Sequence, residues 1–88
     1  MKEAEIERII KPLGNRRRIA ILLHLRKRQW ATVTDISEFM HLSLTATSRH
    51  LSMLERAGFL EKKQSSLNVY YRISPDAPPM LASLFAMA

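Results

Sequence analysis

Two short helical stretches separated by only three residues, with a change of periodicity directly after the second, most constrain the fold of this chain. Apolar side chains recur at helical spacing over 35–40 and 44–57, and His41-Leu42-Ser43 separates the two stretches. We expect Thr34 and Ser43 to cap these helices, because their hydroxyls can accept hydrogen bonds from the free N–H groups of a helix start. The pattern predicts a helix-turn-helix unit.

The residues after the second helix are typical of a β-hairpin. Gly58 suits the left-handed backbone position that ends a helix, and a Schellman ending is expected there. Apolar and polar residues then alternate over 59–63 and 67–73, with a polar turn between them. A hairpin that follows a helix-turn-helix predicts the wing of a winged helix, with Lys62 and Lys63 approaching its tip.

The remaining segments complete the expected fold. Helices are predicted over 3–11 and 16–28, with Asn15 as the N-cap of the second, and a brief extended segment follows near Trp30. A last short helix is expected after the proline-rich break. Because 88 residues provide room for one core, we predict a single mainly α (α+β) domain over 1–88, with five helices and a two-stranded wing.

The helix over 44–57 has two chemically different faces. At about 100° per residue, its inward face is expected to contain Leu44, Thr47, Leu51, Leu54 and Ala57. Its outward face contains hydroxyls and arginines, namely Thr45, Ser48, Arg49, Ser52 and Arg56. Hydroxyl groups can contact phosphates and base edges, and an arginine can donate two hydrogen bonds to guanine. This face predicts a helix that enters the major groove of DNA.

The charge of the chain is strongly positive and unevenly distributed. The formal net charge is +6, and residues 13–28 contain six Lys and Arg side chains with no acidic residue. Like charges without acidic partners repel one another, so this block favours a polyanionic partner. A solvated helix face, or a helix on an anionic membrane surface, are the alternative interpretations; the second would require a free helix, whereas the apolar side of this one is needed in the core.

Several functional classes have no support in the sequence. The absence of cysteine excludes disulfides, thiolate metal ligands and a cysteine nucleophile. His24, His41 and His50 show no ligand spacing on one helix, so we expect neither a metal site nor a cofactor. No nucleophile–base pair, carboxylate dyad or glycine-rich phosphate loop predicts an enzyme. Without a signal peptide or a transmembrane-length apolar run, the expectation is a cytoplasmic protein with no membrane partner.

Four stretches of the chain, in order, resemble the ArsR-type winged-helix transcriptional repressors. They are 13–22, where Arg18 matches the usual arginine, then 42–51, 54–60 and 69–73. The second reads Leu-Ser-Leu-Thr-Ala-Thr-Ser-Arg-His-Leu, with Thr47 where the family usually has valine. The resemblance implies a homodimer that joins through its first and last helices, binds a palindromic operator and represses transcription.

The chain departs from metal-sensing members of that family. Many of these contain a Cys-x-Cys near the third helix, where this chain has 29–33, and others use Asp and His on the last helix. The segment 80–88 contains no ionisable side chain. Metal control is therefore not expected, and the sequence identifies no inducer.

These patterns lead to two sets of expected site residues. The DNA-binding set is Arg16, Arg17, Ser43, Thr45, Ala46, Ser48, Arg49, His50, Lys62 and Lys63. The dimer-interface set is Ile6, Ile9, Ile10, Met80, Leu81, Leu84 and Phe85. The alternative function is a winged-helix module that binds another protein and makes no DNA contact.

Overall fold

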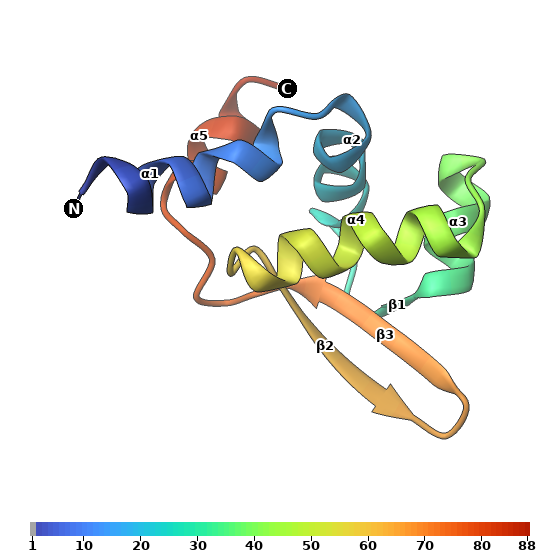
Figure 1. Cartoon of the computed structure of the whole chain (residues 1–88). Coiled ribbons are helices and arrows are strands. Elements are labelled where there is room, and N and C mark those ends of the chain that lie inside the picture. The colour runs from blue at the N-terminus through green and yellow to red at the C-terminus, as the bar shows by residue number, and fades with distance from the viewer. Residues whose placement is uncertain (1) are drawn as a thin grey trace.

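The computed structural model describes residues 2–88 and contains five α-helices and a small antiparallel sheet that projects away from them (Figure 1). The elements in chain order are α1 (Glu3–Ile10), the 3-10 helix η1 (Lys11–Leu13), α2 (Arg16–Leu25), β1 (Ala31–Thr32), α3 (Val33–Met40), α4 (Leu44–Arg56), β2 (Leu60–Ser65), β3 (Asn68–Ile73) and α5 (Met80–Ala86). Helices α3 and α4 form the helix-turn-helix, and β2 and β3 project below α4 as the wing (Figure 1). The predicted winged helix-turn-helix fold is confirmed.

Side-chain caps begin three of the helices. The Asn15 carboxamide oxygen accepts hydrogen bonds at the start of α2, and the Ser43 hydroxyl accepts one at the start of α4, as predicted. The prediction of Thr34 as the cap of α3 is wrong. The Thr32 hydroxyl accepts the Asp35 N–H at 3.0 Å instead, so α3 begins at Val33 directly after β1.

Two left-handed residues set the path of the chain around α4. His41 has φ 55° in the turn before this helix, and Gly58 has φ 89° after it. The Phe59 N–H donates to the Leu54 carbonyl and the Gly58 N–H donates to the Glu55 carbonyl, which is the expected Schellman ending. This ending reverses the chain into β2 and fixes the wing relative to α4.

The wing differs from its predicted form in two respects. The sheet has three strands in the order β1-β3-β2, because the short strand β1 pairs with β3 as well. The hairpin turn is Ser66-Leu67, with Ser65 opposite Asn68, so β2 extends further than expected. Ser66 has φ 58°, which allows this two-residue turn. The two wing lysines therefore lie within the strand rather than beside the tip.

The core contains most of the predicted apolar residues, with three corrections. Its buried hydrophobic members are Ile21, Leu22, Leu25, Ala31, Ile36, Leu51, Leu54, Phe59, Leu60, Tyr71 and Leu81. Leu44 was expected to face inward but is 54% exposed, because the first turn of α4 lies beyond the core. Phe39, whose helical spacing with Ile36 and Met40 predicts an inward position, is also exposed and stacks on the ring of His24, while Ser37 is buried on α3. Leu81, expected at a dimer interface, is 4% exposed within the single chain and belongs to the core.

Thr47 is expected to lower the stability of this core. Its side chain is fully buried, and its hydroxyl has no hydrogen-bond partner among residues 2–88. Because an unsatisfied buried hydroxyl costs about 1–3 kcal/mol, Thr47→Val should raise the free energy of unfolding by an amount in that range. Urea unfolding followed by circular dichroism measures the change. Thr45→Val, at an exposed position of the same helix, should change stability by less than about 0.5 kcal/mol. A loss of stability in the Thr47 variant would contradict the assignment.

Candidate nucleic-acid interface

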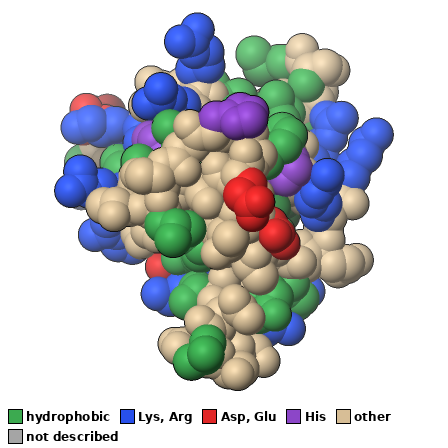
Figure 2. Space-filling model, turned by 90° about the vertical axis from the view of Figure 1, so that its right-hand side faces the viewer, with side chains coloured by type: hydrophobic (Ala, Val, Ile, Leu, Met, Phe, Trp, Pro, Cys, Tyr) green, Lys and Arg blue, Asp and Glu red, His purple; other side chains and the backbone are tan. Residues whose placement is uncertain are grey.

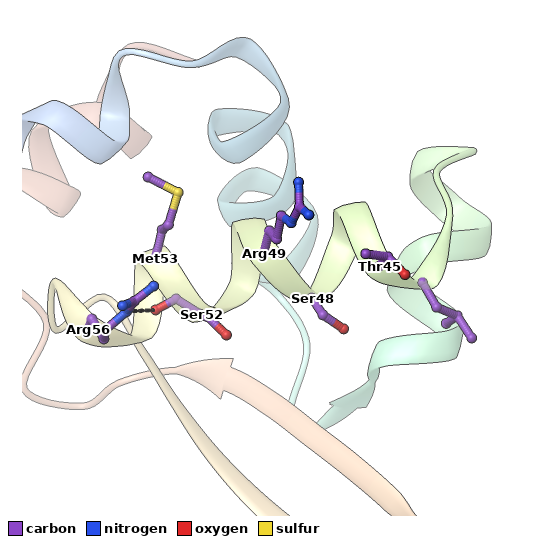
Figure 3. A pocket seen from close by; sticks show the side chains of 7 residues that line it. Thr45, Ser48, Arg49, Ser52, Met53 and Arg56 are labelled. Carbon is purple, nitrogen blue, oxygen red and sulfur yellow. Dashed lines mark hydrogen bonds between the residues drawn. The ribbon is translucent and has the colours of Figure 1, made fainter.

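The outer face of α4 is a shallow hollow that lies open to solvent (Figure 3). It has a volume of about 660 Å³, and its lining comes from this helix alone: Leu44, Thr45, Ser48, Arg49, Ser52, Met53 and Arg56. In Figure 3 the side chains of Ser48 and Ser52 point toward the hairpin, and those of Arg49 and Met53 point toward α2. The lining contains hydroxyls, two guanidinium groups and two apolar side chains, and no acidic residue.

Cationic side chains near this face remain without acidic partners. Within the described part of the chain, the one ion pair joins Arg72 to Glu61 on the wing. Arg49 on α4, with Arg16 and Arg17 in the first turn of α2, is exposed. These three guanidinium groups can therefore bind an external anion without breaking a protein salt bridge.

The start of α4 is capped by Ser43, as the sequence predicts. Ser43 is exposed, and its hydroxyl oxygen lies 3.0 Å from the Ala46 nitrogen whose proton it accepts. The hydroxyl proton is still available for a further acceptor. Ala46 is half-buried behind this cap, whereas Thr45 and Ser48 are exposed. The first turn of α4 thus combines free hydroxyl groups with a small apolar side chain.

Arg18 connects α2 to η1 and α4 behind that face. Its Nε donates to the Pro12 carbonyl oxygen at 2.6 Å, and its Nη1 lies 3.3 Å from both His50 Nδ1 and Met53 Sδ. A guanidinium group can only donate, so His50 Nδ1 is the acceptor and the ring proton resides on Nε2. Burial, together with the charges of Arg18 and Arg17, lowers the pKa of His50 below its usual range. The neutral ring is half-buried, with its Nε2–H free to donate.

The basic block over 13–28 divides into two groups at opposite ends of α2. Arg26 lies over the Phe85 ring at 5.4 Å and donates to the Phe85 carbonyl, and Arg28 donates to the His24 carbonyl. Figure 2 shows Lys and Arg side chains along both edges of the face that contains α3, with acidic side chains between them. Helix α2 has ten residues, so it separates the two groups by about 15 Å. Only the group at its first turn lies on the side of α4.

The two wing lysines lie on opposite faces of the sheet. Lys63 pairs with Tyr70, and its ammonium lies 4.5 Å from the centre of the Trp30 ring. Arg72 lies on the same ring at 4.6 Å. Lys62 pairs with Tyr71, which is buried against the helices, so Lys62 is on the sheet face that the helices cover. It is exposed there because the hairpin extends past the core.

The expected dimer residues form part of an apolar groove at the other end of the molecule. The groove has a volume of about 510 Å³ and is lined by Ile10, Leu13, Ile19, Leu23, Met80, Ser83, Leu84, Met87 and Ala88. Ile6 and Ile10 of α1 are 38% and 48% exposed, and Ile9 is half-buried. Phe85 packs against the core and is not a lining residue. The expected interface residues did not include Leu13, Ile19 and Leu23, which form the wall that η1 and α2 supply.

Residues 2–88 contain neither a cluster of metal ligands nor a membrane-spanning helix. No three His, Asp or Glu side chains of this part of the chain gather in a way that could hold a metal ion. None of its helices is long and apolar enough to span a membrane.

His24, stacked on Phe39 with 3.6 Å between ring centroids, has its pKa lowered by burial and by the charge of Arg28.

Comparisons with known proteins agree with this architecture. The model of the family described as bacterial regulatory protein, arsR family, matches residues 15–62. The transcriptional activator HlyU of Vibrio cholerae is 32% identical over 66 residues, and the arsenic resistance transcriptional regulator ArsR1 of Pseudomonas putida is 30% identical over 70 residues. These alignments cover 75% and 80% of this chain, and 60% and 55% of the relatives.

Solved structures of related proteins share the fold over nearly the whole chain. A homodimeric winged helix-turn-helix DNA-binding domain of Mycobacterium bovis superposes with a TM-score of 0.77, is 32% identical, and covers 96% of this chain and 74% of its own. HlyU of Vibrio cholerae has a TM-score of 0.81 at 28% identity, with 99% and 97% covered. Both the family match, which includes the helix-turn-helix and the first part of the wing, and these superpositions show that the chain belongs to the ArsR family of bacterial regulatory proteins.

Proposed function

We propose that this chain is a homodimeric, sequence-specific DNA-binding regulator that represses transcription from a palindromic operator. The observation that carries the proposal is the outer face of α4, which combines free hydroxyls and arginines and has no acidic lining residue. Residues 1–88 would form one DNA-binding domain of a cytoplasmic protein without catalytic activity. The relatives are named as transcriptional regulators and as a DNA-binding domain, which supports this class of function.

In the proposed complex, the first half of α4 enters the major groove. Thr45, Ser48 and Arg49 contact base edges, because the start of a recognition helix approaches the bases most closely. Arg16 and Arg17 bind backbone phosphates from the first turn of α2, and the Nε2–H of His50 donates to a phosphate. Ser43 and Ala46 contact the backbone at the entry of α4. These contacts divide into those that specify sequence and those that set position.

Dimerisation would bury the apolar groove of η1, α2 and α5. Ile10, Met80 and Leu84 contribute apolar surface to it, and a groove of this kind is unfavourable in contact with water. The M. bovis relative is described as a homodimer. A twofold arrangement would present two copies of α4 to successive turns of the duplex, which is why the proposed operator is palindromic.

Binding-site selection from random duplex DNA tests the proposal directly. We expect enrichment of an inverted repeat with half-site centres about 10 base pairs apart, or a multiple of that distance. Fluorescence anisotropy at about 50 mM and 200 mM salt should show a loss of affinity of several orders of magnitude on the selected duplex. No enrichment, with no salt-dependent binding, would favour the protein-interaction module. A promoter–reporter fusion carrying the selected site should show lower expression when the protein is present.

The wing should contribute one phosphate contact, and it should come mainly from Lys62. Lys63 is held on the Trp30 ring, whereas Lys62 lies exposed on the opposite sheet face. Lys62→Ala should weaken binding about equally for all sequences and reduce the salt slope by about one per contact. Lys63→Ala, with the same change in charge, is the matched comparison and should have a smaller effect. Equal losses in both variants would show that the wing rearranges on DNA.

Metal and metalloid ions are expected to leave DNA binding unchanged. The chain has no thiol ligand, and arsenite and antimonite bind proteins through thiolates, while zinc and nickel need clustered imidazole, thiolate or carboxylate groups. Titration of zinc, nickel, cadmium and arsenite into the protein–duplex complex measures the response by anisotropy. A tight stoichiometric release of the duplex would reveal a site that includes His24 or His41.

A further inference from the structure

A second hollow lies between α1, η1 and the C-terminal end of α4. It has a volume of about 390 Å³ and is lined by Arg8, Lys11, Pro12, Met53, Arg56 and Ala57. Three of these side chains are cations that come from three different elements, and none of the lining residues is acidic. The others are apolar, with Pro12 buried. We call this hollow the α1–α4 pocket.

The pocket is continuous with the outer face of α4. Met53 and Arg56 line both of them, so a ligand that covers this face also passes the mouth of the pocket. Arg56 is seven residues after Arg49, which places it about 10 Å further along the helix axis. A helix whose first half lies in the major groove meets the sugar–phosphate backbone at such a distance, where the groove ends.

Arg18 fixes the geometry of the pocket from behind. Its guanidinium holds the Pro12 carbonyl on η1 and the Met53 sulfur on α4 at the same time. The apolar floor is therefore set by contacts between two helices and does not depend on a flexible loop. Arg8 and Lys11 follow one another at a spacing of three residues, which brings both cations to one side of the α1–η1 segment.

We propose that the α1–α4 pocket binds a phosphate of the DNA backbone beside the major groove, with the adjoining deoxyribose on the apolar floor. The proposal rests on the DNA binding proposed above and adds a contact outside the helix-turn-helix and the wing. Arg8, Lys11 and Arg56 would surround the phosphate oxygens, and Pro12 and Met53 would contact the sugar. Such a contact adds affinity and fixes register without reading a base.

The test compares two lysines that differ in place and not in chemistry. Lys11→Gln removes one cation of the pocket, and Lys27→Gln removes one exposed cation at the far end of α2, so the net charge changes equally. Binding is measured by anisotropy over a range of salt, on a labelled mixed-sequence duplex and on the selected duplex. Thermal melts by circular dichroism verify that both variants fold.

The expected result is a reduction of the salt slope by about 0.9 for each protomer's contact in Lys11→Gln, equal on both duplexes, and none in Lys27→Gln. Arg8→Gln should act in the same way. A single methylphosphonate, which removes the charge at one backbone position, should then weaken the wild-type complex more than the Lys11→Gln complex at the contacted phosphate.

Two other outcomes overturn the proposal in distinguishable ways. Equal slopes for Lys11→Gln and Lys27→Gln would mean that only net charge matters, and the pocket would have no role. If Arg49→Ala nevertheless weakens binding to the selected duplex, the proposed function stands and the pocket alone fails. If neither Lys11→Gln nor Arg49→Ala changes the affinity for the selected duplex, DNA binding through the outer face of α4 fails as well.

Discussion

Replacing Leu84 with aspartate is expected to release monomers and to reduce affinity for the selected operator by at least about two orders of magnitude. Leu84 lines the apolar groove beside Ile10 and Met80, and it is half-buried within a single chain. A carboxylate in a dimer interface at this position would lose its hydration without gaining a partner. A monomer would then bind each half-site separately and lose the advantage of linked binding.

The matched control for this change is Ala82→Asp. Ala82 is exposed on the same helix and is not a lining residue of the groove. The Ala82→Asp change therefore adds the same charge outside the proposed interface. Sedimentation should give the 10.2 kDa mass of one chain for Leu84→Asp and twice that mass for Ala82→Asp. A dimeric Leu84→Asp protein with normal helix content would mean that the subunits associate through another surface.

Arg49→Ala should cause the largest loss of sequence discrimination. Arg49 is exposed on the outer face of α4, without an acidic partner in the described chain, and a bidentate contact to guanine is worth about 1–3 kcal/mol. We expect a loss of this size on the selected duplex and a relaxed preference at one base pair of each half-site. Affinity for a panel of single-base variants of the selected duplex measures both effects.

Two further variants define what Arg49 does. Arg49→Lys retains the charge but not the planar pair of donors, so it should restore part of the affinity without restoring the base preference. Arg17→Ala, which removes a proposed phosphate contact, should weaken all members of the panel by a similar factor. If Arg49→Ala also weakens them uniformly, its guanidinium binds the backbone and another side chain reads the guanine.

Local capping rules predicted the starts of α2 and α4 correctly and placed the start of α3 incorrectly. Asn15 and Ser43 cap α2 and α4 as expected. Thr32 and Thr34 have the same hydroxyl two residues apart. The choice between them depends on β1, whose pairing with β3 holds the chain extended up to Thr32. The sequence predicts an extended segment near Trp30, but a partner strand so distant in the sequence gives no local signal for the residue at which that segment ends.

The same limit explains which parts of the site were predictable. The outer face of α4 follows from helical periodicity, so its hydroxyls and Arg49 could be identified without knowledge of the fold. Periodicity does not say where a helix extends past the core, and for this reason Leu44 was assigned to the wrong face. Lys62 and Lys63 point to opposite faces in any strand, but which of them lies on the face that the helices cover depends on the register set by the Ser66-Leu67 turn. The α1–α4 pocket depends on how η1 packs beside α4, a contact without a sequence motif.

The position of the single tryptophan makes its fluorescence a reporter of the wing. The ammonium of Lys63 and the guanidinium of Arg72 both lie within 4.6 Å of the centre of the Trp30 ring, so its indole experiences the field of two cations from two strands of the hairpin. Indole emission responds to charges at such short range, and no other tryptophan in the chain contributes to the signal. Motion of the hairpin can therefore be followed in the unlabelled protein, separately from the docking of α4.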